Sequence, residues 1–170
     1  MLPVPPDLAG DDGQTIEAVR RAWDPVMADR IGPHVTIVHD VIDAERAGRV
    51  LDAVADELPA FSIAFAGTAC WASPPIGVYL HVVDLDGGVA ALRDRLAQLE
   101  APGWTGAPYE PHVTLVHPKW IEPGTADAAW AALRRYDIEA TVTIDAVATV
   151  KLGDERWDTI ATHRLAAARE

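Results

Sequence analysis

The chain has 170 residues, of which 49% are hydrophobic, and this suits one globular domain with a substantial core. Its 26 acidic and 14 basic residues give a net charge of −12, which argues against binding of long nucleic acids. There is no membrane-spanning apolar run, no signal-peptide pattern and a single cysteine, so no internal disulfide can form. We therefore expect a cytoplasmic monomer without a membrane partner.

The first half of the chain alternates between helical and strand patterns. A helix is predicted near 14–23, and a β-branched segment at 33–39 follows it as a strand. A second helix begins at an Asp43 N-cap and ends before Pro59. Alternating apolar residues then predict two strands, at 61–65 and 78–82.

The second half repeats this order of elements. A helix near 88–99 precedes a strand at 111–117, and an alanine-rich helix near 127–135 follows. Three further strands are predicted near 139–144, 147–152 and 156–163. Short turns rich in glycine and proline join the strands, which favours antiparallel pairing and an α+β fold.

The most informative feature is an internal repeat. Residues 33–39 read Pro-His-Val-Thr-Ile-Val-His, and residues 111–117 read Pro-His-Val-Thr-Leu-Val-His. A long period that occurs only twice indicates a duplicated half-domain rather than a repeat array. We predict a bilobal, pseudo-twofold domain of antiparallel sheets flanked by helices, with lobes of roughly 1–85 and 86–170 and the active site in the cleft between them. Exchange of strands between the lobes is left open.

Each copy of the repeat places a histidine and a threonine two residues apart. Side chains at i and i+2 of a strand share a face, so His34 lies with Thr36, and His112 with Thr114. Two such faces meeting at a pseudo-twofold axis would surround one pocket with two imidazoles and two hydroxyls. A structural strand pair preserved by duplication is the alternative interpretation.

This set of side chains suits the chemistry of a phosphodiester. A neutral imidazole can take a proton from the attacking water, and a protonated imidazole can give one to the leaving oxygen. The hydroxyls can donate hydrogen bonds to the phosphate oxygens. The scheme needs no metal or other cofactor. His39 and His117 end the two copies, but their odd offset places them on the opposite face, so a four-histidine metal site is disfavoured.

The doubled segments, His34-Val-Thr-Ile and His112-Val-Thr-Leu, resemble the signature of the two-histidine (2H) phosphoesterase superfamily. Along nearly its whole length the chain is similar to bacterial proteins described as 2′-5′ RNA ligase-like. The resemblance implies metal-independent hydrolysis of a 2′,3′-cyclic phosphate or a related small nucleotide phosphodiester. It also implies that His34 and His112 are catalytic, and that Thr36 and Thr114 bind the substrate phosphate.

The expected partner is a small nucleotide-like phosphodiester or a short RNA end. Tyr79 and Tyr109 are candidates for base stacking or for lining the cleft. Four tryptophans near predicted loops or strand ends are further stacking candidates: Trp71, Trp104, Trp120 and Trp157. Two alternatives remain open, an RNA end-processing or 2′-5′ ligating enzyme and a nucleotide-binding module without turnover.

Overall fold

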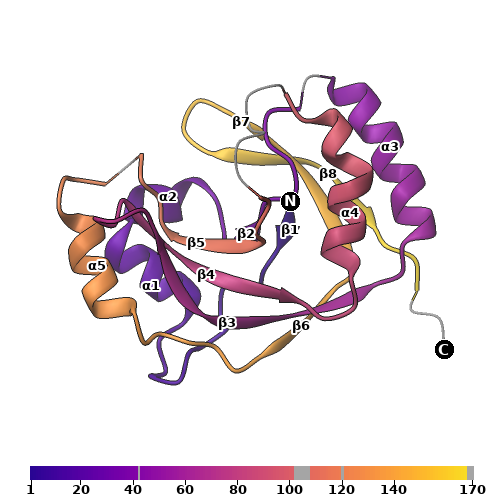
Figure 1. Cartoon of the computed structure of the whole chain (residues 1–170). Coiled ribbons are helices and arrows are strands. Elements are labelled where there is room, and N and C mark those ends of the chain that lie inside the picture. Colours follow the sequence, from indigo (N-terminus) through magenta and orange to yellow (C-terminus); the bar gives the residue numbers. More distant parts are fainter. Residues whose placement is uncertain (42, 102–107, 120, 168–170) are drawn as a thin grey trace.

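The computed structural model describes residues 1–41, 43–101, 108–119 and 121–167 (Figure 1). The helices are α1 (Ile16–Trp23), α2 (Pro25–Arg30), α3 (Ala44–Glu57), α4 (Gly88–Leu96) with the 3-10 turn Ala97–Leu99, and α5 (Thr125–Leu133). The strands are β1 (Leu2–Pro3), β2 (His34–Val35), β3 (Phe61–Trp71), β4 (Gly77–Asp84), β5 (His112–Val116), β6 (Thr141–Ile144), β7 (Ala146–Leu152) and β8 (Trp157–Arg164).

The strands form one antiparallel sheet and one hairpin. The sheet has the order β1-β2-β5-β4-β3-β6, and β7 and β8 form the hairpin. The amino group of Met1 donates to the Ala148 carbonyl at 2.7 Å, and the Ala148 amide donates to the Met1 carbonyl at 2.8 Å. These two hydrogen bonds join the edge of the sheet to the hairpin, so the sheet is nearly closed. The predicted α+β fold with antiparallel sheets is confirmed.

The helices lie in two groups at the two ends of the sheet. Figure 1 shows α1, α2 and α5 on the left and α3 with α4 on the right. Val35, Leu80 and Val113 are fully buried in the central strands, which places the core directly behind the repeated segments. Within the described residues, no helix has the length and apolar character that crossing a bilayer would require.

Local sequence explains the starts of two helices. The Asp43 carboxylate accepts the Arg46 amide at 2.9 Å and so caps α3, as predicted. Asp24 and Pro25 begin the short helix α2, which the sequence patterns did not predict. β3 continues as far as Trp71, where a loop was predicted.

The first repeated segment is less regular than predicted. Only His34 and Val35 belong to β2, so the prediction of a strand over 33–39 is wrong beyond Val35. The reason is a competing hydrogen bond, because the Arg93 guanidinium donates to the Ile37 carbonyl at 2.7 Å. A carbonyl that is bonded by a side chain in this way does not need a strand partner.

Candidate active site

The two copies of the repeat pair with each other in the middle of the sheet. Val35 of β2 and Val113 of β5 are register partners, and both are fully buried. Because the strands are antiparallel, the neighbours of one valine lie opposite the neighbours of the other. The half-buried polar side chains lie on the other face of the sheet from these valines. By this register His34 lies across from Thr114, and Thr36 lies across from His112.

Each histidine of the repeat is held by the same backbone contact. Nδ1 of His34 lies 2.8 Å from the Gly32 carbonyl oxygen, and Nδ1 of His112 lies 2.8 Å from the Glu110 carbonyl oxygen. A carbonyl oxygen can only accept, so Nδ1 carries the proton in both rings. In the neutral rings Nε2 is then the proton acceptor, which is the form that a general base needs.

Burial also favours the neutral form of these rings. It lowers the pKa of His34 to about 4, and the positive charge of Arg20 acts in the same direction. Burial likewise lowers the pKa of His112, whereas the hydrogen bond to Glu110 opposes that shift. Both imidazoles are therefore neutral near neutral pH, which is the state that a general base needs before it takes a proton.

An aromatic cluster borders the second histidine. Strand β4 runs beside β5, so that Tyr79 is the register partner of Thr114, and His81 that of His112. The Trp71 and Tyr79 rings stack with centroids 4.7 Å apart, and both present an edge-on contact to His112 at 5.3 and 5.2 Å. The predicted cleft residue Tyr79 thus lies next to His112, and Trp71 lies there with it.

The second predicted tyrosine lies at the other copy of the repeat. The Tyr109 hydroxyl donates to the Thr36 carbonyl at 2.9 Å. The guanidinium of Arg93 lies 5.0 Å above the Tyr109 ring. Tyr109 therefore supports the backbone of the first copy and does not join the cluster of Trp71 and Tyr79 around His112.

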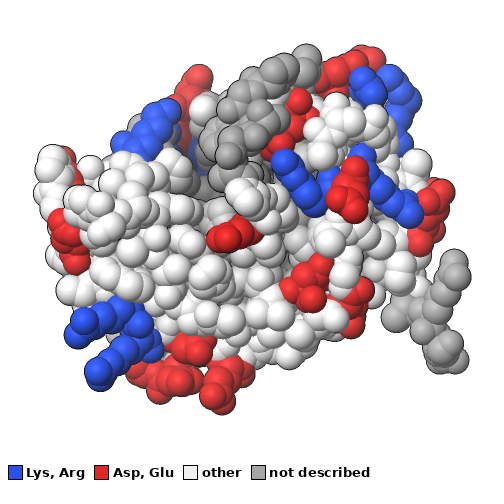
Figure 2. All heavy atoms as spheres, viewed as in Figure 1, with Lys and Arg blue, Asp and Glu red and all other residues white. Residues whose placement is uncertain are grey.

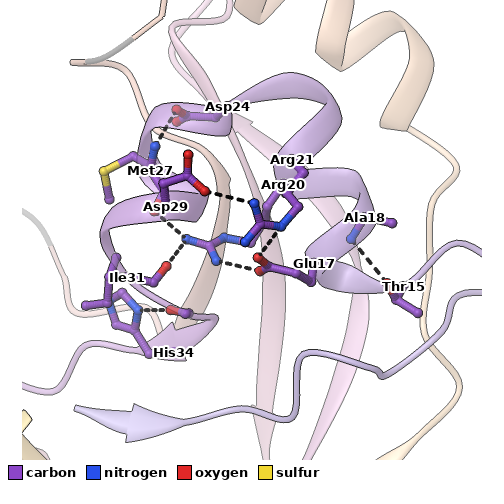
Figure 3. Close-up of polar contacts among 11 residues, drawn as sticks. Thr15, Glu17, Ala18, Arg20, Arg21, Asp24, Met27, Asp29, Ile31 and His34 are labelled. Carbon is purple, nitrogen blue, oxygen red and sulfur yellow. Dashed lines mark hydrogen bonds and ion pairs between the residues drawn. The ribbon is translucent and has the colours of Figure 1, made fainter. Parts of the chain in front are cut away.

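A buried arginine lies behind the loop that holds His34, and no sequence pattern distinguished it. Arg20 of α1 is 2% exposed and donates to the Ile31 carbonyl at 2.7 Å (Figure 3). It also pairs with Glu17 at 3.1 Å. Ile31 directly precedes Gly32, whose carbonyl accepts the hydrogen bond from the His34 ring. The Arg20 guanidinium therefore stabilises the backbone segment that orients this imidazole. In the sequence, Glu17, Arg20 and Arg21 look like an ordinary solvent-exposed helix face, and no pattern indicates that Arg20 is buried.

Several of the remaining histidines and tryptophans are placed elsewhere. Within the described ranges, no group of three or more His, Cys, Asp or Glu side chains is arranged to hold a metal ion. Nδ1 of His117 accepts the Lys119 amide at 3.1 Å, and His163 pairs with Asp52 at 2.7 Å. Trp157 lies on the hairpin strand β8. Two stacking candidates lie outside the described residues, Trp104 and Trp120.

Comparison with known proteins gives a consistent result. A family model described as the 2′-5′ RNA ligase superfamily matches residues 4–156. The structure of TT0787 from Thermus thermophilus superimposes with a TM-score of 0.57 and 16% identity, covering 90% of this chain and 94% of that chain. The structure of E. coli LigT complexed with 3′-AMP gives a TM-score of 0.51 and 16% identity, covering 88% and 92% respectively. No curated protein matches the sequence.

Proposed function

The chain belongs to the 2′-5′ RNA ligase superfamily, and from this premise we propose that it is a metal-independent phosphodiesterase. Its substrate is a nucleoside 2′,3′-cyclic phosphate or a related small nucleotide phosphodiester. One observation carries the proposal: each of the two repeated histidines makes a hydrogen bond from its Nδ1 to a backbone carbonyl. This leaves the Nε2 atom of each ring to accept a proton.

The proposed reaction uses the two imidazoles in opposite roles. Nε2 of one histidine takes a proton from water while the water oxygen forms a bond to phosphorus. Nε2 of the other, protonated, gives its proton to the ribose oxygen as the P–O bond breaks. The products are a phosphomonoester and a free hydroxyl group. A bound phosphate anion raises the pKa of the acidic imidazole and so keeps it protonated against the effect of burial.

The neighbouring side chains suit a nucleotide. Thr36 and Thr114 are half-buried like the two histidines, and in the proposed reaction their hydroxyls donate to the non-bridging phosphate oxygens. The partly exposed ring of Trp71, stacked on the buried Tyr79, lies beside His112, and a base can pack against it. A related structure, that of LigT, was determined with 3′-AMP, which supports a substrate of this size.

The proposal is tested with purified protein, a chelator and the four nucleoside 2′,3′-cyclic monophosphates. We expect turnover that falls by about 100-fold or more in His34→Ala and in His112→Ala. His163→Ala is the control, because that ring pairs with Asp52 away from the repeat, and it should keep wild-type kcat/KM. Wild-type activity in either variant of the repeated histidines would contradict the mechanism.

One feature favours a second candidate, the processing of RNA ends. A groove of about 450 Å³ between α3 and α4 has an apolar floor and three arginines, Arg46, Arg49 and Arg95. Figure 2 shows basic side chains at this end of the molecule with acidic side chains among them, and Arg95 pairs with Glu57 at 2.7 Å. Arginines placed in this way can contact the phosphates of a short RNA chain.

Salt dependence separates the two candidates. If the groove binds RNA, KM for an oligoribonucleotide with a cyclic phosphate end rises steeply with salt, and Arg46→Gln with Arg49→Gln weakens that dependence. KM for a mononucleotide would be unchanged by the same substitutions. Equal salt dependence for both substrates would exclude a role for the groove.

A further inference from the structure

The last residue of the second repeated segment is anchored by a buried carboxylate from the first half of the chain. Asp24, between α1 and α2, is 1% exposed. One of its oxygens accepts the His117 amide at 2.8 Å, across 93 residues of sequence, and the other accepts the Met27 amide at 3.0 Å. Both acceptors of this carboxylate are therefore used by backbone donors.

The last residue of the first segment is anchored in the same way from the second half. Glu100 follows α4, and its side chain is 6% exposed. Its Oε1 accepts the His39 amide at 2.9 Å, and both of its oxygens pair with Arg93. Arg93 also donates to the Ile37 carbonyl, so the pair contacts the first segment at two points.

His39 and His117 occupy the same position of the repeat, and their anchors are crossed. The carboxylate that precedes the first copy holds the second copy, and the carboxylate that precedes the second copy holds the first. We propose that Asp24 and Glu100 are positioning residues, which set His112 and His34 relative to each other. This inference rests on the proposed phosphodiesterase function.

The lengths of the two strands explain why such anchors are needed. β5 is a continuous five-residue strand, so a bond to the next amide, that of His117, restrains the strand along its axis. The first segment leaves the sheet after Val35, and there Glu100 and Arg93 take the place of strand partners. At their other ends, the segments carry the imidazoles whose relative placement controls a two-histidine reaction. An error of about 1 Å in such a placement can cost about 100-fold in rate.

Substitution by the isosteric amide removes these anchors with little change in shape. An asparagine at position 24 replaces one of the two carboxylate oxygens with an NH2 group, which only donates, so either the Met27 amide or the His117 amide loses its acceptor. A glutamine at position 100 loses its charge against Arg93 and one of its acceptor atoms. The controls are Asp29→Asn on α2 and Glu139→Gln, since both carboxylates are exposed.

The test measures the imidazoles directly by 15N NMR of their ring nitrogens, alongside kcat and KM for a nucleoside cyclic phosphate. We expect Asp24→Asn to shift the His112 ring signals and Glu100→Gln to shift those of His34. Each variant should lose about 10- to 100-fold in kcat while KM changes by less than about threefold. The two control variants should match wild type in both measurements.

Two outcomes would overturn the inference. One is a folded variant of Asp24 or Glu100 with wild-type ring signals and wild-type kcat. The other is a loss of stability with unchanged ring signals, because that is what a purely structural ion pair would produce. If Asp24→Asn does not fold, Glu100→Gln alone decides, since Glu100 lies nearer the surface. The NMR measurement needs no turnover, so failure of the proposed function remains distinguishable from failure of the positioning role.

Discussion

Val35 and Val113 lie directly opposite each other in neighbouring antiparallel strands, so the two copies of the repeat meet at their own centres. This pairing brings side chains that are 78 residues apart in sequence onto one face of the sheet. The surroundings of the two copies differ on the polar face, because Trp71 and Tyr79 contact His112, whereas the first copy leaves the sheet after Val35. Each copy is therefore tested by its own substitution.

The two threonines provide the first prediction. Thr36→Val and Thr114→Val keep the shape of the side chain and remove its hydroxyl donor. If these hydroxyls bind the phosphate in the transition state, each substitution lowers kcat/KM by about 100-fold. Steady-state kinetics on the nucleoside cyclic phosphates measures the loss. Thr143→Val on the exposed side of β6 is the matched control, and equal activity of all three variants would contradict the assignment.

The pKa of His34 makes a second prediction, about stability and pH. Burial lowers this pKa from 6.5 to about 4 in the folded chain, whereas the unfolded chain keeps the ordinary value. Between these values the unfolded state binds the extra proton, so the free energy of unfolding falls as pH falls through this window. The contribution of one such group has a slope of at most about 1.4 kcal/mol per pH unit.

Urea unfolding at several pH values between 4 and 7 measures this slope. His34→Gln removes the titrating group, and we expect its stability to depend less steeply on pH than that of the wild type. His112 also has a lowered pKa, so part of the slope remains in the variant. Identical slopes for the two proteins would show that His34 is not protected from protonation in the folded state.

The third prediction concerns the glycine under Trp71. A Cβ atom at Gly77 would lie 2.7 Å from Trp71 Cε3 and 2.7 Å from the Val116 carbonyl oxygen. Gly77→Ala therefore pushes the indole away and destabilises the fold by about 1 to 3 kcal/mol. Because the indole contacts His112, we also expect reduced kcat/KM and a changed near-UV CD spectrum of the tryptophans.

A second glycine serves as the control for this prediction. Gly48 lies within α3, and a Cβ atom there would have no neighbour within 4 Å. Gly48→Ala should raise the free energy of unfolding by up to about 1 kcal/mol, because alanine is the better helix former. Equal stability of the two alanine variants would contradict the prediction, because it would mean that the Trp71 ring moves aside at no cost to make room for a Cβ atom at position 77.

The fourth prediction concerns Arg20 and its exposed neighbour Arg21. Arg20→Met leaves the Ile31 carbonyl without its guanidinium donor and Glu17 without one of its charge partners, at a cost of about 2 to 4 kcal/mol. Arg21→Met removes an arginine whose side chain is 56% exposed, and its cost should stay within about 0.5 to 1 kcal/mol. Denaturant unfolding compares the two. Equal losses would contradict the buried role of Arg20.

The sequence predicted the parts of this fold that depend on local pattern. The second repeated heptapeptide, the Asp43 cap and the apolar spacing of α3 located their elements correctly, because caps and periodicity act over a few residues. The i, i+2 rule applies within β5 for His112 and Thr114, whereas Thr36 lies beyond the end of β2. The catalytic and phosphate-binding roles of His34, Thr36, His112 and Thr114 remain predictions.

Features that depend on distant segments were not predictable from pattern. The contact between Trp71 and His112 needs the length of the β3–β4 hairpin and the register of β5, neither of which is encoded locally. The early end of β2 results from Arg93, which lies 56 residues beyond Ile37. The buried bond from His117 to Asp24 likewise joins residues whose separation carries no periodic signal.

The contact between Met1 and Ala148 also bears on how the protein behaves at high concentration. A strand with a free edge offers unpaired N–H and C=O groups on which another chain can add a strand and begin to aggregate. Here β1 pairs with β2 on one side, Met1 just before β1 bonds to Ala148 on the other, and Pro3 has no N–H to offer. The edge beside His34 is thus closed to edge-to-edge association, which keeps this side of the sheet from acting as a template for aggregates.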